Sequence, residues 1–149
     1  MDAGFATGHD PLVVRDINFR RVRVLIVDDS LVFRRCAREL LECRGYHVAG
    51  EADCATAAIE ATERLAPEAA LVDIGLPHPD GVALACHLRI AYPAVAVLLM
   101  SADPDVDPDW LLRRTGARGF VAKSELGVAD LIDYWPAPKA AGTEADPCL

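Results

Sequence analysis

The chain has 149 residues, of which 52% are hydrophobic and 26% are charged, and its formal net charge is −8. This profile is typical of one folded domain with its own core, and the negative charge argues against a nucleic-acid-binding surface. No run of about 18 apolar residues predicts a membrane span, and the first ten residues, MDAGFATGHD, lack the apolar segment of a secretory signal. We therefore expect a cytoplasmic protein that contacts neither nucleic acid nor membrane directly.

The chain is predicted to begin with an N-terminal extension over residues 1–20, which shows no clear hydrophobic periodicity. One domain, over residues 21–135, is predicted to follow. It starts with an aliphatic run at 24–27, the pattern of a strand buried on both faces. Ser30 is placed to cap a helix whose apolar side chains recur at helical spacing, and Gly45 is placed to end that helix.

The middle of the domain repeats this alternation of strand and helix. Residues 46–49 predict a short second strand, and the apolar spacing over 58–65 predicts a second helix, which Pro67 ends. Residues 69–72 form the third predicted strand. Asp80 is placed to cap a third helix.

The last third of the domain contains the most hydrophobic predicted strand, residues 94–100. The acids and prolines of SADPDVDPDW then predict a short or delayed fourth helix. That helix begins at Asp107-Pro108 and ends at Gly116, since proline is tolerated in a first turn. Residues 120–122 predict a fifth strand, and the apolar spacing over 128–135 predicts a fifth helix.

The C-terminal residues, 136–149, are rich in proline and alanine, so we predict a flexible tail. The five cysteines contain no CxxC pair and fall mostly in predicted helices, which predicts reduced and mostly buried thiols. Arg34, Arg35 and Arg38 are the best candidates for a local basic patch, but a solvated helix face is the favoured interpretation.

Five strand–helix units in succession predict a parallel sheet with helices on both faces. Units of this length favour a flavodoxin-like (βα)5 doubly wound fold with strand order 2-1-3-4-5. In such a sheet, ligands bind beyond the carboxyl ends of the strands, where the winding direction reverses. Here that reversal falls between the first and third strands.

Polar side chains follow four of the predicted strands at this edge. Asp28 and Asp29 follow the first strand, Asp73 the third, Ser101 the fourth and Lys123 the fifth. Three carboxylates this close repel one another unless a cation binds, and carboxylate oxygens are ligands that Mg²⁺ prefers. One carboxylate could then act as a nucleophile toward phosphorus, while an ammonium and a hydroxyl stabilise the transferred group.

These residues resemble the receiver domain of bacterial two-component response regulators, through VLIVDDS, LVDIGLPHPDG, LLMSA and GARGFVAKSEL. The resemblance covers about residues 21–135. It implies the following roles: metal site, Asp28, Asp29 and Asp73; phosphoacceptor, Asp73; phosphoryl stabilisation, Ser101 and Lys123; conformational switch, Ser101 and Phe120. Mg²⁺ is the implied cofactor, and the implied donor is a histidine kinase or a histidine phosphotransfer protein.

The expected function is that of a stand-alone receiver, not an enzyme, which switches protein–protein interactions with an unidentified partner. Its oligomeric state is left open. Alternatives are a phosphorelay shuttle or sink, a degenerate module that acts without phosphorylation, and an enzyme-like phosphotransferase that uses an acid of the first strand as nucleophile. The sequence departs from the family pattern at Ser124, where many receivers have proline, and its KSEL segment resembles receivers that precede a helix-turn-helix domain.

Overall fold

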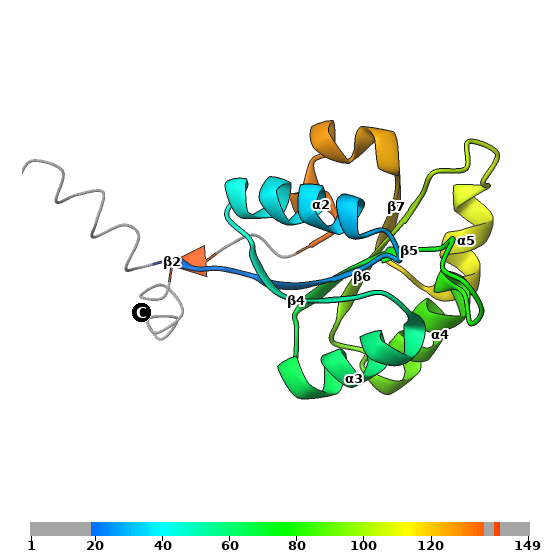
Figure 1. Ribbon diagram of the computed structural model, residues 1–149, viewed down its shortest axis with the longest axis horizontal. Helices are drawn as coiled ribbons and strands as arrows, with labels where there is room; N and C mark the ends of the chain where they lie inside the picture. The colour runs from blue at the N-terminus through cyan, green and yellow to red at the C-terminus, as the bar shows by residue number, and fades with distance from the viewer. Residues whose placement is uncertain (1–18, 136–138, 141–149) are drawn as a thin grey trace, which may run out of the picture.

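The computed structural model describes residues 19–135 and 139–140 of the chain. Its main sheet has five parallel strands in the order β4-β3-β5-β6-β7 (Figure 1). The strands are β3 (Arg23–Val27), β4 (His47–Ala52), β5 (Ala69–Asp73), β6 (Ala96–Ser101) and β7 (Gly119–Ala122). Counted along the chain this is the order 2-1-3-4-5, which confirms the predicted flavodoxin-like fold.

Helices cover both faces of this sheet. They are α2 (Leu31–Cys43), α3 (Ala55–Leu65), α4 (Gly81–Ala91) and α5 (Pro108–Thr115), with two 3-10 helices, η1 (Lys123–Val128) and η2 (Leu131–Asp133). In Figure 1, α2 and the 3-10 helices lie on one side of the sheet, and α3, α4 and α5 lie on the other.

Side-chain caps fix where the helices begin. Ser30 accepts a hydrogen bond from Phe33 N at the start of α2, and Asp80 accepts one from Ala83 N at the start of α4. Asp107 caps α5, and Gly116 ends it with a φ of 71°, in the left-handed region that favours glycine. These predicted helix boundaries are confirmed, and α5 is short, with 8 residues.

Two apolar layers hold the helices to the sheet because alternate strand residues point to opposite faces. In β3, Val24 and Ile26 face the layer under α2, whereas Leu25 and Val27 face the layer under α3 and α4. All four side chains are fully buried. The position of the site at the sheet edge is therefore set by a rigid core on both sides.

The predicted fifth α-helix is wrong. The chain there forms η1 and η2, separated by extended backbone at Ala129 and Asp130. Leu131 and Trp135 are buried as their spacing predicted, but Val128 is 85% exposed. Two short turns bury the same anchors without a continuous helix, and Gly127 has a low helix propensity.

The prediction of mostly buried thiols is also wrong for the cysteines in the described residues. Cys36 and Cys43 are exposed, and Cys54 and Cys86 are half-buried. On α2 the buried positions are Ala37 and Leu41, so both of its cysteines lie off the core-facing stripe.

The ends of the described chain form a small second sheet. Strand β2 (Phe19–Arg20) pairs antiparallel with β8 (Lys139–Ala140). The other parts of the predicted extension and tail, residues 1–18, 136–138 and 141–149, lie outside the described residues. No helix in the described part of the chain is long and apolar enough to cross a membrane.

Candidate phosphoacceptor site

The candidate site lies at the carboxyl edge of the sheet, beside the reversal in strand order between β3 and β5. Asp28 directly follows β3, and its main-chain N–H donates to the Ala52 carbonyl at the end of β4, at 3.0 Å. Asp73 is the last residue of β5, and Lys123 follows β7 directly. Parallel strands end at the same edge, so residues far apart in sequence meet there.

Three acids form a compact cluster at this edge. Asp28, Asp29 and Asp73 each offer one carboxylate oxygen, and these oxygens all lie within 4.8 Å of one another. Asp28 and Asp73 are buried, whereas Asp29 is exposed. An all-carboxylate donor set that is open to water on one side fits Mg²⁺, which takes oxygen ligands and retains several waters.

Both carboxylate oxygens of Asp28 are engaged. Oδ1 accepts a hydrogen bond from Ser30 N at 2.8 Å, and Oδ2 forms an ion pair with Lys123 Nζ at 2.6 Å. The side chain is completely buried. A charge in that position is stable only with such partners, so Lys123 is part of what holds the cluster together.

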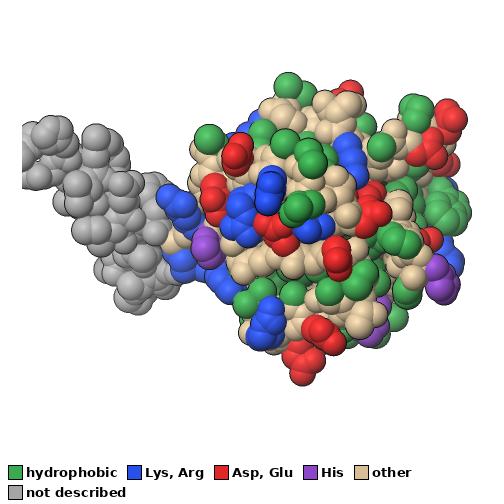
Figure 2. Space-filling view, viewed as in Figure 1, with side chains coloured by type: hydrophobic (Ala, Val, Ile, Leu, Met, Phe, Trp, Pro, Cys, Tyr) green, Lys and Arg blue, Asp and Glu red, His purple; other side chains and the backbone are tan. Residues whose placement is uncertain are grey.

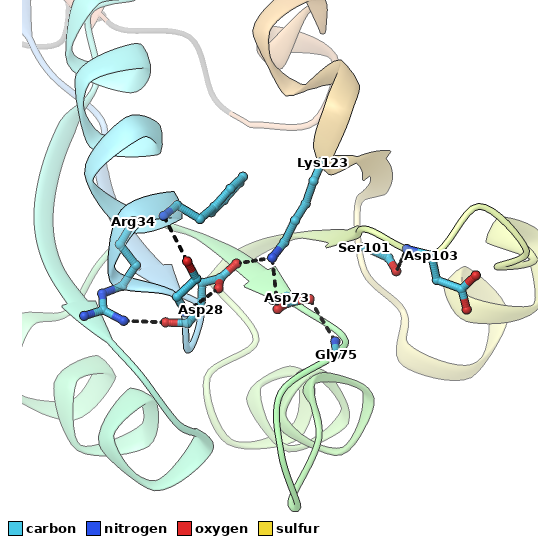
Figure 3. Close-up of polar contacts among 9 residues, drawn as sticks. Asp28, Arg34, Asp73, Gly75, Ser101, Asp103 and Lys123 are labelled. Carbon is cyan, nitrogen blue, oxygen red and sulfur yellow. Dashed lines mark hydrogen bonds and ion pairs between the residues drawn. The ribbon is translucent and has the colours of Figure 1, made fainter.

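Lys123 lies between the two buried acids (Figure 3). Its Nζ is 3.2 Å from Asp73 Oδ2, and it also sits 4.5 Å from the centroid of the Phe33 ring, a cation–π distance. Burial works to lower the pKa of Lys123, but contact with Asp28 and the charges of both carboxylates outweigh it and raise that pKa. The ammonium is therefore kept protonated at neutral pH.

Asp73 is held in one orientation by the backbone that follows it. Its Oδ1 accepts a hydrogen bond from Gly75 N at 2.9 Å. Burial and then repulsion from Asp28 raise the pKa of Asp73, against the opposing effects of the Gly75 N–H and Lys123. A carboxylate whose ionised form is relatively destabilised is a good candidate for chemistry.

The start of α4 packs directly on the backbone of Asp73. A Cβ atom added to Gly81 would lie 2.1 Å from the Asp73 carbonyl oxygen and 2.5 Å from Ile74 Cα, both main-chain atoms. Only glycine permits this approach. Gly81, Gly75 and Phe33 were not predicted from the sequence as residues of the site. The neighbouring acceptor motif contains both glycines, but only the fold reveals their contacts.

Ser101 and Phe120 lie farther from the acid cluster. The Ser101 hydroxyl is buried at the end of β6 and accepts a hydrogen bond from Asp103 N at 2.9 Å, on the side of Asp73 away from Asp28 (Figure 3). Phe120, in β7, is half-buried and packs against the layer that includes Leu99 and Leu111. The structure thus brings four predicted residues together and leaves these two beside them.

Comparisons with known proteins agree with this geometry. The family model of the response regulator receiver domain matches residues 24–134. The virulence-factor transcription regulator BvgA of Bordetella pertussis is 34% identical over 106 residues, 69% of this chain and 49% of BvgA. A LuxR-family two-component response regulator from Aurantimonas has a crystal structure with 30% identity and a TM-score of 0.67, covering 76% of this chain and 81% of that one.

A third similarity is to the signal receiver domain of NarL from Mycobacterium tuberculosis, with 27% identity and a TM-score of 0.63 over 85% of this chain and 95% of that one. The chain spans about half the length of the curated relatives that it matches. A receiver domain is a phosphoacceptor signalling module rather than a conventional enzyme. From the family match, the strand order and the pocket of acids with Lys123, the chain belongs to the response regulator receiver domain family.

Proposed function

We propose that this protein accepts a phosphoryl group on Asp73 and transmits the signal by changing its contacts with other proteins. The observation that carries the proposal is the meeting of Asp73 with Lys123 and two further acids at one sheet edge. Such a pocket offers a carboxylate nucleophile, a fixed cation and a set of oxygen ligands in one place.

In the proposed reaction, a carboxylate oxygen of Asp73 forms a new P–O bond while the bond between phosphorus and the donor breaks. The proposed donor is a phosphohistidine of a histidine kinase or a histidine phosphotransfer protein, whose imidazole nitrogen leaves with the bonding electron pair. Lys123 Nζ, 3.2 Å from Asp73 Oδ2, is placed to neutralise charge on the transferred group. Catalysis of this kind depends on positioning and electrostatics.

We assign Asp28, Asp29 and Asp73 as the residues that hold Mg²⁺. The acidic cluster is typical of the Mg²⁺ site of receiver domains. When bound, the ion supplies positive charge that stabilises the oxygens of the phosphoryl group. Exposed Asp29 leaves room for the waters that Mg²⁺ retains.

We assign the switch to Ser101 and Phe120. Ser101 Oγ accepts from Asp103 N, so its own proton is available to a phosphoryl oxygen on Asp73. Rotation toward that oxygen would weaken the contact with the segment that leads to α5 and vacate space behind β6. Phe120, on the neighbouring strand, is the large side chain placed to fill that space. The switch is thus a population shift driven by one new interaction.

The proposed output is a change in contacts with partner proteins by the receiver over 21–135, which the predicted extension over 1–20 and the predicted tail over 136–149 flank. A relay shuttle or phosphate sink is the alternative, and transfer of label from Asp73 to a phosphotransfer protein would favour it. An enzyme that uses an acid directly after β3 as nucleophile is a further alternative, and covalent labelling of Asp28 or Asp29 with Asp73 unmodified would favour it.

The test is phosphorylation by a small donor. Wild-type protein treated with acetyl phosphate or phosphoramidate and Mg²⁺ should gain one phosphoryl group, measured by intact mass, and base should remove it. Asp73→Asn should gain none, and chelation of Mg²⁺ should slow the wild-type reaction strongly. Full labelling of the Asp73→Asn variant would overturn the proposal and favour a module that acts without phosphorylation of this residue.

A further inference from the structure

Arg34, on α2, makes two contacts that reach outside its own helix. Its Nη1 donates to the main-chain carbonyl oxygen of Asp28 at 2.6 Å, and its Nε donates to Glu51 Oε1 at 2.9 Å (Figure 3 shows the contact with Asp28). The Arg34 side chain is only 14% exposed. It is therefore not part of a solvated helix face, which corrects the sequence-based interpretation for this residue.

Together with a main-chain hydrogen bond, these contacts fix the backbone of Asp28 on both sides. Its N–H donates directly to Ala52 O in β4, and its carbonyl is joined through Arg34 to Glu51, the residue before Ala52. Both polar groups of the Asp28 backbone are thus fixed to the same end of one neighbouring strand. The carbonyl belongs to the peptide that links Asp28 to Asp29. These hydrogen bonds therefore set the direction of the chain at Asp29.

The charge of Arg34 is balanced locally. Glu51 accepts from Arg34 with one oxygen and from Arg38 Nε with the other, at 2.8 Å. Figure 2 shows basic and acidic side chains side by side over α2, without a patch of one sign. A guanidinium already paired with a carboxylate changes the field at the acid cluster little, so its effect on Asp28 is orientational.

We propose that Arg34 is a positioning residue for the metal site, which holds the Asp28–Asp29 peptide so that the Asp29 carboxylate faces Asp73. This inference rests on the proposed function and adds to it a residue that does not touch the reacting atoms. Lysine cannot replace arginine here, because its single ammonium lacks the planar fork that reaches two separate acceptors.

Arg38 supplies a matched control. It forms the same type of ion pair with the same Glu51 and also contacts Glu42 at 3.5 Å, but neither of these contacts involves Asp28. Arg34→Gln and Arg38→Gln therefore each remove one cation from this network, and only the first releases the Asp28 carbonyl. Arg34→Lys keeps the charge but removes the planar guanidinium group that contacts both Glu51 and the Asp28 carbonyl.

The first experiment uses the 149-residue chain without metal. Amide NMR spectra of the wild type and the three variants should show changed shifts and faster hydrogen exchange at residues 28–30 in Arg34→Gln and Arg34→Lys, but not in Arg38→Gln. Denaturant unfolding on the same samples shows whether each variant is folded. Equal changes at residues 28–30 in Arg34→Gln and Arg38→Gln, or none in either, would overturn the positioning role.

The second experiment is a Mg²⁺ titration of the same proteins, followed by calorimetry or amide shifts. Loss of a side chain that orients metal ligands typically weakens binding about tenfold or more, so Arg34→Gln and Arg34→Lys should bind Mg²⁺ about tenfold more weakly than Arg38→Gln. Equal affinities for all three variants, with normal wild-type binding, overturn the inference and leave the proposed function intact. Wild-type protein that neither binds Mg²⁺ nor takes up phosphate contradicts the proposed function itself.

Discussion

Replacing Lys123 with methionine tests how the acid cluster is stabilised. The change keeps an unbranched apolar stem beside Phe33 but removes the cation that contacts Asp28 and Asp73 at 2.6 and 3.2 Å. Removing one partner of a buried ion pair costs about 3–5 kcal/mol. Because Lys123 is 18% exposed, solvent screens part of this interaction, and we expect a loss of about 2 kcal/mol. In a domain of this size the loss corresponds to a Tm lower by about 8 °C.

The free energy of unfolding that is lost in Lys123→Met depends on pH. The pKa of Lys123 is raised in the folded state, so its contribution is fully present below the pKa of lysine in the unfolded chain and disappears as pH rises through the folded value. At low pH the stability lost in Lys123→Met should also be smaller. Protonation of Asp73, whose pKa is raised, removes one of the two buried negative charges that the substitution leaves without a cation. Urea unfolding of both proteins from pH 4 to 8 measures the decrease in this loss on the acid side. A Lys123→Met variant within about 0.5 kcal/mol of the wild type at pH 7, the range of ordinary surface changes, would refute the reasoning.

Three further predictions concern the surroundings of the site. Gly81→Ala should cost about 1–3 kcal/mol in urea unfolding, as overpacking does, since its Cβ would meet the Asp73 carbonyl oxygen at 2.1 Å; a neutral effect would contradict the contact. Ser101→Ala should still take up phosphate, but beryllofluoride should then leave amide shifts at residues 104–120 nearly unchanged; shifts equal to the wild type would exclude Ser101 as the coupling element. Burial works to raise the pKa of Glu51, but its two arginine partners hold it below the usual value, so its contribution is lost as pH falls through that lower pKa. Glu51→Gln should thus lose about 1 kcal/mol at pH 7 and approach the wild type in acid, whereas a constant difference would contradict the pairing.

The fold was predictable because its strands are nearly continuous aliphatic runs that alternate with capped helices. A parallel sheet places its strand ends at one edge. The meeting of Asp28, Asp73 and Lys123 could therefore be predicted from the sequence alone. Asp29 was predicted at the same edge because it follows Asp28 directly in the sequence. Ser101 was also predicted at this edge, but the structure engages its hydroxyl with Asp103.

The remaining features depend on tertiary contacts that local patterns do not encode. Arg34 has the spacing of a solvated helix residue, and only the placement of β4 beside α2 brings Glu51 within reach. The last predicted helix shows the opposite case. Leu131 and Trp135 have helical spacing and are buried, yet two 3-10 turns satisfy both positions. Val128 and Ile132, which belong to the same predicted spacing, are exposed. The spacing therefore identified two buried anchors, but neither the full set of buried side chains nor the backbone between them.

The central claim, that Asp73 is the residue that receives the phosphoryl group, is tested most directly by chemical mapping of the modified side chain. Protein phosphorylated with acetyl phosphate and Mg²⁺ is treated with borohydride, which reduces an acyl phosphate to an alcohol, and the peptides are sequenced by mass spectrometry. We predict conversion of Asp73 to homoserine, dependent on both the donor and Mg²⁺. Homoserine at Asp28 or Asp29 with Asp73 unchanged, or phosphate that survives reduction on a serine or histidine, would contradict the account.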